Sequence, residues 1–245
     1  MIVVEDLRKT FGATRAVDGV SFSARDGQIT ALLGANGAGK TTTLRMLYTL
    51  MRPDSGRILV DGIDVQHDPL AVRRVLGVLP DARGLYRRLT ARENIEYYGA
   101  LQGLAPARAR ARIDELIQML SMQDIAGRRT EGFSQGERLK TALARALIHE
   151  PRNVLLDEPT NGLDVMSTRS LREFLRRLRA EGQCVLFSTH IMQEVAALCD
   201  QVVIIARGRV VAEGSPDALR ERAGEASLEE AFMKLIGARA LGELS

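Results

Sequence analysis

The sequence is poor in the side chains that proteins use for base stacking and for cross-linking. It has no tryptophan, an aromatic fraction of 4%, two cysteines and four lysines. So few aromatic side chains leave little surface on which nucleic-acid bases could stack. The 34 basic residues barely exceed the 31 acidic ones, so the chain also lacks the strong positive charge that would attract nucleic acid. We therefore expect no nucleic-acid partner.

The two cysteines stand apart from each other and from any metal-binding pattern. Cys184 begins the apolar run Cys-Val-Leu-Phe, and Cys199 ends the run Ala-Ala-Leu-Cys. Isolated cysteines in such runs are typical of small buried residues in a reducing compartment. We expect neither a disulfide nor a metal site from them.

Long hydrophobic runs are also missing. The longest are about five residues, such as 202–206, whereas a membrane-spanning helix needs roughly 18. The first six residues include two acids and no base, unlike a signal peptide. With 45% hydrophobic and 27% charged residues, the composition is that of a globular protein. We expect a chain that does not cross the bilayer and that lies in the cytoplasm.

The hydrophobic pattern changes along the chain from strands to helices and then to an alternation of both. Residues 1–60 favour short strands, with a hairpin-type turn at Asp26-Gly27 before a strand at 29–33. From about residue 85 the spacing is helical. Beyond residue 150 strands alternate with helices, which is typical of an α/β protein with a mostly parallel sheet. The expected elements there are strands at 153–157, 184–188, 202–206 and 210–213, a helix whose apolar face holds Leu171, Phe174, Leu175 and Leu178, and a helix from Met192.

Two features of the helical regions deserve separate predictions. Ser134 followed by Glu137 fits a capping box, which predicts a helix from Gly136 to Ile148. Arginines recur in two other helices, at 108–112 and at 172–179. We expect these arginines to cover solvated helix faces.

A phosphate-binding loop is the strongest motif. Residues 34–41 match the P-loop pattern, and they follow an apolar strand and open a helix predicted over 42–50. In such a loop backbone N–H groups surround a phosphate, the lysine reaches the β- and γ-phosphates, and the hydroxyl can bind Mg²⁺. A glycine-rich turn is the alternative for the loop alone. The residues assigned to nucleotide binding here are Gly34, Ala35, Asn36, Gly37, Ala38, Gly39, Lys40, Thr41 and Thr42.

Asp157 ends the predicted buried strand 153–157, and Glu158 follows it directly. By itself an Asp-Glu pair after a strand would indicate a helix cap or a turn. Beside a P-loop, Asp157 is placed to hold Mg²⁺, and Glu158 is placed to act as the general base on the attacking water.

Together with four further motifs, these residues resemble the ATP-binding subunits of ABC transporters. The motifs span residues 3 to 215 and follow one another in the order typical of that family. The signature of that family resembles residues 133–137, Phe-Ser-Gln-Gly-Glu, and its D-loop resembles residues 161–164, Asn-Gly-Leu-Asp. Its switch histidine resembles His190, and Phe11 stands where the family stacks an aromatic ring on adenine. The resemblance implies a P-loop NTPase (RecA-like) core with an N-terminal antiparallel β subdomain and an inserted α-helical subdomain. It divides a single domain, 1–245, into a core with its β subdomain (1–84 and 151–220), a helical subdomain (85–150) and a C-terminal tail (221–245).

The resemblance also implies a mechanism and partners. ATP and Mg²⁺ would bind, with Lys40, Glu158 and His190 as catalytic residues. Two copies would pair head to tail, and Ser134 and Gly136 of each would complete the site of the other. Gln135, Glu137 and Asp164 are also assigned to nucleotide binding. His190 on its own would more often be a structural histidine, as we expect of His67 and His149. A separate membrane-spanning permease would be the other partner, which places the chain on the inner face of the cell membrane.

The chain departs from the family at three positions. Gln135 replaces a glycine and Glu137 replaces a glutamine, and we expect both changes to be tolerated because Ser134 and Gly136 carry the phosphate contact. Asp81 stands where the family has the Q-loop glutamine. Because aspartate is shorter, we expect Asp81 to reach the metal through water.

Finer assignments stay open at this point. Residues 77–94 and 227–232 resemble sodium-export ATPases of the NatA type, and multidrug exporters of the same ABC-2 branch share most of this similarity. Cytosolic ABC ATPases of DNA repair or translation usually have coiled-coil insertions or two cassettes, which this sequence lacks. P-loop kinases and GTPases have no use for the signature motif, and Glu158 and His190 argue against a non-hydrolytic module.

Overall fold

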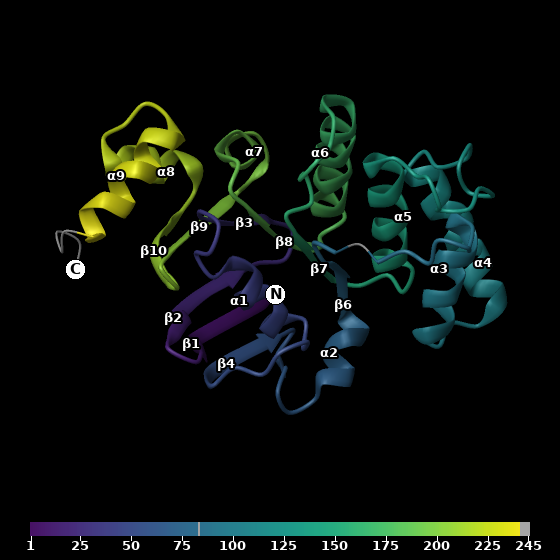
Figure 1. The fold of residues 1–245 in the computed structure, drawn as a ribbon, viewed down its shortest axis with the longest axis horizontal. Coiled ribbons are helices and arrows are strands. Elements are labelled where there is room, and N and C mark those ends of the chain that lie inside the picture. The colour runs from purple at the N-terminus through teal and green to yellow at the C-terminus, as the bar shows by residue number, and fades with distance from the viewer. Residues whose placement is uncertain (83, 241–245) are drawn as a thin grey trace.

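The chain forms two β-sheets with helices between and around them (Figure 1). The structure is a computed structural model and describes residues 1–82 and 84–240. The first sheet is antiparallel, in the order β2-β1-β4-β5. Its strands are β1 (Ile2–Phe11), β2 (Thr14–Ala24), β4 (Ser55–Val60) and β5 (Ile63–Asp64).

The second sheet has the order β10-β9-β3-β8-β7-β6 and is parallel except for β10. Its strands are β3 (Ile29–Leu33), β6 (Leu76–Leu79), β7 (Asn153–Asp157), β8 (Cys184–Thr189), β9 (Gln201–Ala206) and β10 (Arg209–Gly214). The predicted α/β class, with its P-loop core, β subdomain and helical insertion, is therefore confirmed.

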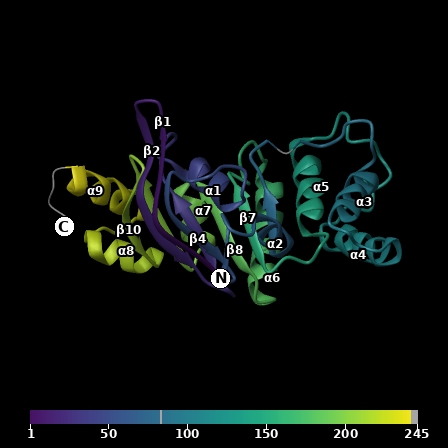
Figure 2. The same ribbon diagram turned by 90° about the horizontal axis from the view of Figure 1, so that it is seen from below.

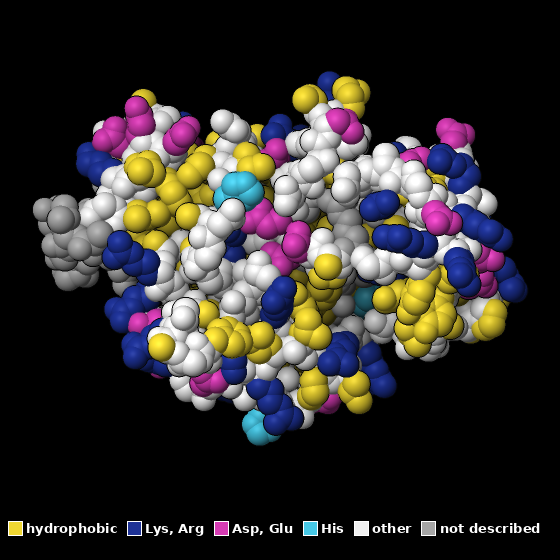
Figure 3. All heavy atoms as spheres, viewed as in Figure 1, with side chains coloured by type: hydrophobic (Ala, Val, Ile, Leu, Met, Phe, Trp, Pro, Cys, Tyr) yellow, Lys and Arg dark blue, Asp and Glu magenta, His cyan; other side chains and the backbone are white. Residues whose placement is uncertain are grey.

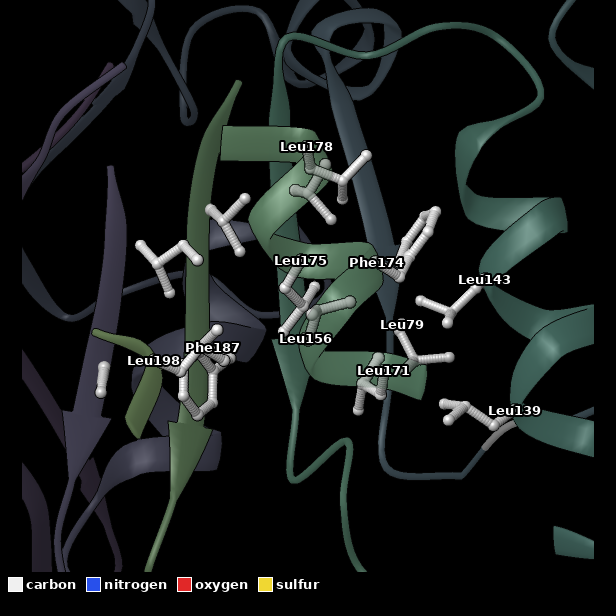
Figure 4. Packing of buried hydrophobic residues seen from close by; sticks show 14 of the residues in the cluster. Leu79, Leu139, Leu143, Leu156, Leu171, Phe174, Leu175, Leu178, Phe187 and Leu198 are labelled. Atoms are coloured by element: carbon white, nitrogen blue, oxygen red, sulfur yellow. The ribbon is translucent and has the colours of Figure 1, made fainter. Parts of the chain in front are cut away.

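The central strands are buried on both faces, and their side chains alternate between two hydrophobic cores. Ala31 and Phe187 belong to the core beneath the later helices, while Leu32 and Leu186 belong to the core shared with the antiparallel sheet. Helix α1 (Lys40–Leu47) fills the space between the sheets, where its Leu44 is fully buried. Helices α6 (Val165–Ala180) and α7 (Met192–Leu198) cover the opposite face (Figure 4). This arrangement explains why β3, β7 and β8 are buried along their whole length and mostly apolar.

The remaining helices, apart from α2, occupy the two ends of the molecule. The predicted helical region contains α3 (Ala91–Leu101), α4 (Pro106–Met119) and α5 (Gln135–Leu147). Helices α8 (Pro216–Ala223) and α9 (Leu228–Ala240) lie at the other end of the long axis, and α2 (Pro69–Val75) precedes β6 (Figures 1 and 2). No helix within the described residues is both long and apolar enough to cross a bilayer. The division into subdomains at 84 and 150 and a tail from 221 stays a prediction, and residues 241–245 of that tail lie outside the described residues.

Three local predictions were wrong. The Asp26-Gly27 turn is not a hairpin, because β2 and β3 belong to different sheets. Gly27 instead donates its N–H to the carbonyls of Gly182 and Gln183, 3.0 and 3.1 Å away, so the turn carries the chain between the sheets. Helix α1 begins at Lys40 rather than Thr42 and ends at Leu47 rather than Leu50, because Thr49 adopts a left-handed φ of 63° that helical backbone cannot follow.

The arginines predicted to cover solvated helix faces are the third correction, since Arg112 of α4 is only 17% exposed and two arginines of α6 form ion pairs with residues far away in sequence. Arg172 is only 30% exposed and makes two hydrogen bonds to Glu194 of α7, of 2.9 and 2.7 Å. Arg179 pairs with Asp200 at 2.9 Å. Their helical spacing looked like a solvated face because the acidic partners are more than 20 residues away in sequence. Both cysteine thiols are free, and burial raises the pKa of Cys184 to about 12.

Candidate nucleotide site

The P-loop connects β3 to α1 and requires glycine at two of its positions. A Cβ atom on Gly34 would lie 2.3 Å from the Ile205 carbonyl oxygen. One on Gly39, whose φ is +108°, would lie 2.5 Å from the Ala16 carbonyl oxygen. Only glycine allows this approach and this backbone conformation. The loop therefore leads its N–H groups into the start of a helix, where anions bind.

Lys40 is held at the centre of the loop. Its side chain is 5% exposed, and its ammonium group donates to the carbonyls of Gly34 at 2.7 Å and Ala35 at 3.2 Å. It also lies 3.2 Å from Oε1 of Glu158. The cation is thus fixed beside the loop that would surround a phosphate and beside the predicted general base.

The end of β7 delivers two carboxylates with different surroundings. Oδ1 of Asp157 accepts hydrogen bonds from Ser188 at 2.6 Å and Thr41 at 3.1 Å. Its other oxygen, Oδ2, is buried and has no partner among the described residues. Burial raises the pKa of Asp157, and repulsion from Asp81 and Glu158 adds to the effect, against the hydrogen bonds of Ser188 and Thr41.

The unpartnered Asp157 oxygen tests whether the residues suit Mg²⁺. A carboxylate and a hydroxyl 3.1 Å apart are hard oxygen donors, and Mg²⁺ is commonly bound by one or two carboxylates together with substrate phosphates and waters. A bound cation would also remove the cost of a buried unpartnered carboxylate oxygen. Thr41 and Asp157 therefore fit a magnesium ion.

Glu158 adopts a left-handed backbone, with φ of 46°. Its N–H donates to Ser188 at 2.9 Å, which holds this conformation. Its carboxylate lies between Lys40 and His190, whose Nδ1 is 3.0 Å from Oε2. Strained backbone of this kind is often found at functional sites. Here it turns the carboxylate from the strand end toward the P-loop.

A hollow of about 440 Å³ lies over these groups. It brings together most of the predicted nucleotide-site residues from β1, the P-loop, β7 and β8. Those lining it are Phe11, Asn36, Gly37, Ala38, Gly39, Lys40, Thr41, Thr42, Asp81, Glu158 and His190. Phe11 is 47% exposed, which leaves its ring open to a stacking partner. Ala16 and Asn161 also line the hollow. Asn161 stands in the D-loop motif, whereas nothing in the sequence pointed to Ala16.

Ser188 is a further residue that the sequence did not assign. It binds both the Asp157 carboxylate and the Glu158 backbone, from the neighbouring strand β8. It directly precedes the Thr-His pair of the switch motif, and this position was the only available signal. Its role depends on the pairing of β7 with β8, which sequence spacing does not reveal.

The signature residues lie outside the hollow over the P-loop. Ser134 caps α5, and its capping box with Glu137 is complete, with bonds of 3.2 and 2.7 Å. These bonds and Arg128, 2.8 Å away, lower the pKa of Glu137, the backbone N–H of Ser134 having the largest effect. A Cβ atom on Gly136 would lie 2.6 Å from Oγ of Ser167.

Gln135 and Asp164 are likewise away from the P-loop. Asp164 caps α6 and accepts two hydrogen bonds from Ser167, each 2.8 Å long. Gln135 lines a neighbouring hollow with Asp81 and Asn161. Within the described part of the chain, one copy thus presents a P-loop site and, separately, the signature and D-loop residues.

Known proteins resemble this chain over almost its whole length. The sequence pattern of the family described as "ABC transporter" matches residues 17–161. The chain is 44% identical to the ABC transporter ATP-binding protein NatA of Bacillus subtilis, over 96% of this chain and 98% of that protein. It is 40% identical to the daunorubicin resistance ATP-binding protein DrrA3 of Streptomyces coeruleorubidus, over 91% and 71%.

A solved structure described as the ATP-binding subunit of an ABC transporter has the same fold. It superposes with a TM-score of 0.88 at 32% identity, over 96% of this chain and 99% of that one. The sequence pattern, the relatives and the P-loop geometry agree. The chain therefore belongs to the ABC transporter family, as one of its ATP-binding and ATP-hydrolysing subunits.

Proposed function

We propose that this chain hydrolyses Mg-ATP to drive export through a separate membrane-spanning subunit. The observation that carries the proposal is the group formed by Lys40, Glu158 and His190 above the buried Asp157 carboxylate. The adenine ring would stack on Phe11, and the P-loop N–H groups and Lys40 would hold the phosphates. The chain would act in the cytoplasm, at the inner face of the membrane.

Each residue at the centre then has one task. Thr41 and Asp157 would hold Mg²⁺, which would supply positive charge against the phosphates. Glu158, freed from Lys40 as the phosphates take up that cation, accepts the proton of the attacking water. His190 moves from its contact with Glu158 to hold the γ-phosphate. Phosphoryl transfer depends mainly on the positions and charges of the surrounding groups. These side chains would therefore be sufficient to catalyse it.

A second copy would complete each site. Ser134 and Gly136, at the N-terminus of α5, lie outside the P-loop hollow of their own chain, and a helix N-terminus favours an anion. Two chains arranged head to tail would place this terminus, together with Gln135, Glu137 and Asp164, against the ATP of the other copy. Closing and reopening of this pair would move the membrane subunit.

The Glu158→Gln variant tests the proposal. The amide keeps the shape of the side chain but cannot accept the proton, so we expect ATP binding to persist while turnover falls at least about a hundredfold. The variant should also accumulate as a dimer with ATP, measured by light scattering. Phosphate release at the wild-type rate would overturn the assignment of Glu158.

For the exported substrate we favour Na⁺ over a drug-like molecule. The favouring observations are the similarity of residues 77–94 and 227–232 to NatA-type ATPases and the near-complete coverage of NatA at 44% identity. Drug export is the alternative, since the chain is also 40% identical to the daunorubicin resistance protein DrrA3. Vesicles containing the membrane subunit encoded beside this chain decide between them. ATP-dependent movement of ²²Na⁺ supports the first, and movement of daunorubicin alone supports the second.

A further inference from the structure

A second hollow of about 550 Å³ adjoins the one over the P-loop. The two share Asp81 and Asn161 as lining residues. The walls of the second come from the segment after β6, from the first turns of α5 and from the D-loop. On this face basic side chains gather over the region of α5, beside acidic side chains near the centre of the molecule (Figure 3). The second hollow thus combines signature and D-loop residues in one place.

Two arginines line this hollow, Arg87 and Arg138. Arg138 follows Gln135 by three residues and the helix cap Ser134 by four, so it shares their face of α5. It is partly buried, yet neither its guanidinium nor that of Arg87 forms an ion pair or hydrogen bond within residues 1–82 and 84–240. A half-buried arginine aimed into a hollow without an acidic partner is suited to an anionic ligand.

The P-loop hollow needs such a cation. Among the described residues that line it, Lys40 is the one lysine or arginine, and the acidic residues Asp81 and Glu158 line it too. Both are close enough to Asp157 to raise the pKa of that carboxyl. A triphosphate adds further negative charge, of which Mg²⁺ offsets only part. In phosphoryl-transfer enzymes an arginine supplied from outside the phosphate loop often neutralises this charge.

We propose that Arg138 of one copy contacts the triphosphate of the ATP held by the P-loop of the other copy. This inference rests on the proposed head-to-tail dimer and adds to it a residue beyond the signature itself. The helix N-terminus at Ser134 would meet the γ-phosphate, and Arg138, one turn further along the same face, would approach it from the side. Arg87 would line the rim of this contact.

The test measures how much ATP is needed to assemble the dimer. In the Glu158→Gln background, R138A should raise the ATP concentration for half-maximal dimer formation at least about tenfold, because a charge-assisted hydrogen bond is lost. R138K, which keeps the charge but not the fork of donors, should lie between R138A and the parent. R110A, which removes an exposed arginine of α4, should match the parent.

Mixed dimers show which ATP the arginine contacts. One chain carries K40A and an intact Arg138, the other carries R138A and an intact P-loop, both in the Glu158→Gln background. In the mixed pair the intact P-loop faces the intact arginine. Radiolabelled ATP should therefore be retained at lower concentrations by the mixture than by R138A alone. Equal retention would mean that Arg138 does not act across the dimer and would overturn the inference.

The two proposals fail in different ways. A parent that stays monomeric at saturating ATP would overturn the proposed dimer, and the inference with it. A parent that assembles with ATP, together with an R138A variant that assembles at the same ATP concentration, would overturn the inference alone.

Discussion

Asp81 shows how one residue change can alter a site whose framework is otherwise kept. It stands after β6 and lines both hollows. Its charge is close enough to Asp157 to raise the pKa of that carboxylate, after the larger effect of burial. A glutamine at this position would have no such effect, because it carries no charge. The substitution therefore adds negative charge where Mg²⁺ would bind.

Asp81→Ala should lower ATP turnover at limiting Mg²⁺ more than at saturating Mg²⁺, because a water-mediated ligand is lost. Asp81→Gln, which introduces the glutamine found in the family, is the matched comparison and should keep more ATPase activity than Asp81→Ala. Phosphate release measured across a Mg²⁺ titration checks this. An alanine variant with unchanged ATPase activity and transport would show that Asp81 has no role in the site.

His149, expected to be structural, illustrates a different constraint at the same scale. Its Nε2 lies 3.2 Å from the Leu76 carbonyl, and its Nδ1 is buried without a partner among the described residues. Burial lowers the pKa of His149 from the ordinary value of 6.5, against a smaller effect of the Leu76 contact. A second proton on the ring would have no acceptor, so the folded chain holds the neutral form.

A depressed histidine pKa makes stability fall in acid. The unfolded chain takes up a proton at about pH 6.5, while the folded chain resists it, so the free energy of unfolding declines as the pH falls below 6.5. His149→Gln keeps a donor for Leu76 but cannot titrate. Its melting temperature should change less between pH 7 and pH 5 than that of the wild type, measured by circular dichroism. Parallel curves for both proteins would contradict the prediction.

At the scale of elements, the ion pairs of α6 hold the helix that follows the switch histidine. Arg172 binds Glu194, whose side chain is 6% exposed, in the first turn of α7. Arg176 donates to the Ala197 carbonyl at 3.1 Å, near the end of the same helix. Helix α7 is only seven residues long, too short to be stable alone. Contacts from α6 therefore decide where it lies.

Arg172→Ala leaves the nearly buried Glu194 carboxylate without its partner. We expect a loss of about 3 kcal/mol in the free energy of unfolding, measured by urea denaturation. Arg169→Ala on the same helix removes an exposed pair, whose side chains are 74% and 62% accessible, and should change stability little. Equal losses in the free energy of unfolding for the two variants would show that burial of the Glu194 pair does not determine its contribution to stability.

At the scale of the whole molecule, the C-terminal region is part of the main core rather than an appendage. Ala231, Phe232 and Leu235 of α9 belong to the same hydrophobic cluster as Phe187 of β8. Helix α9 contacts α8, α7 and β10. The helical region at the other end joins this cluster through residues such as Leu143 of α5. One core thus runs from one end of the long axis to the other.

Phe232→Ala should therefore cost about 3 to 5 kcal/mol of stability, as expected for a buried phenylalanine. Met233→Ala changes the neighbouring side chain, which is 66% exposed, and is the control. Thermal unfolding with and without ATP measures both. A Phe232 variant as stable as the control would mean that α9 is not held by the core.

Local sequence was sufficient for the features that depend on near neighbours. The P-loop, the capping box at Ser134 and the apolar strands follow from glycine geometry, helix capping and burial, so their positions could be predicted to within a few residues. The order of the motifs was also sufficient for the family. Element ends were less certain, as α1 shows, because they depend on single backbone angles such as that of Thr49.

Tertiary structure alone decided the relations between segments that are far apart. The role of Ser188 needs β7 beside β8, the Arg172 pair needs α6 beside α7, and Arg138 lines a hollow only because α5 approaches the D-loop. The scarcity of long apolar runs and aromatic side chains guided the expectations about partners, but it located no residue of the site. Placing the few charged groups at the site required the fold, because charge acts through space and not along the chain.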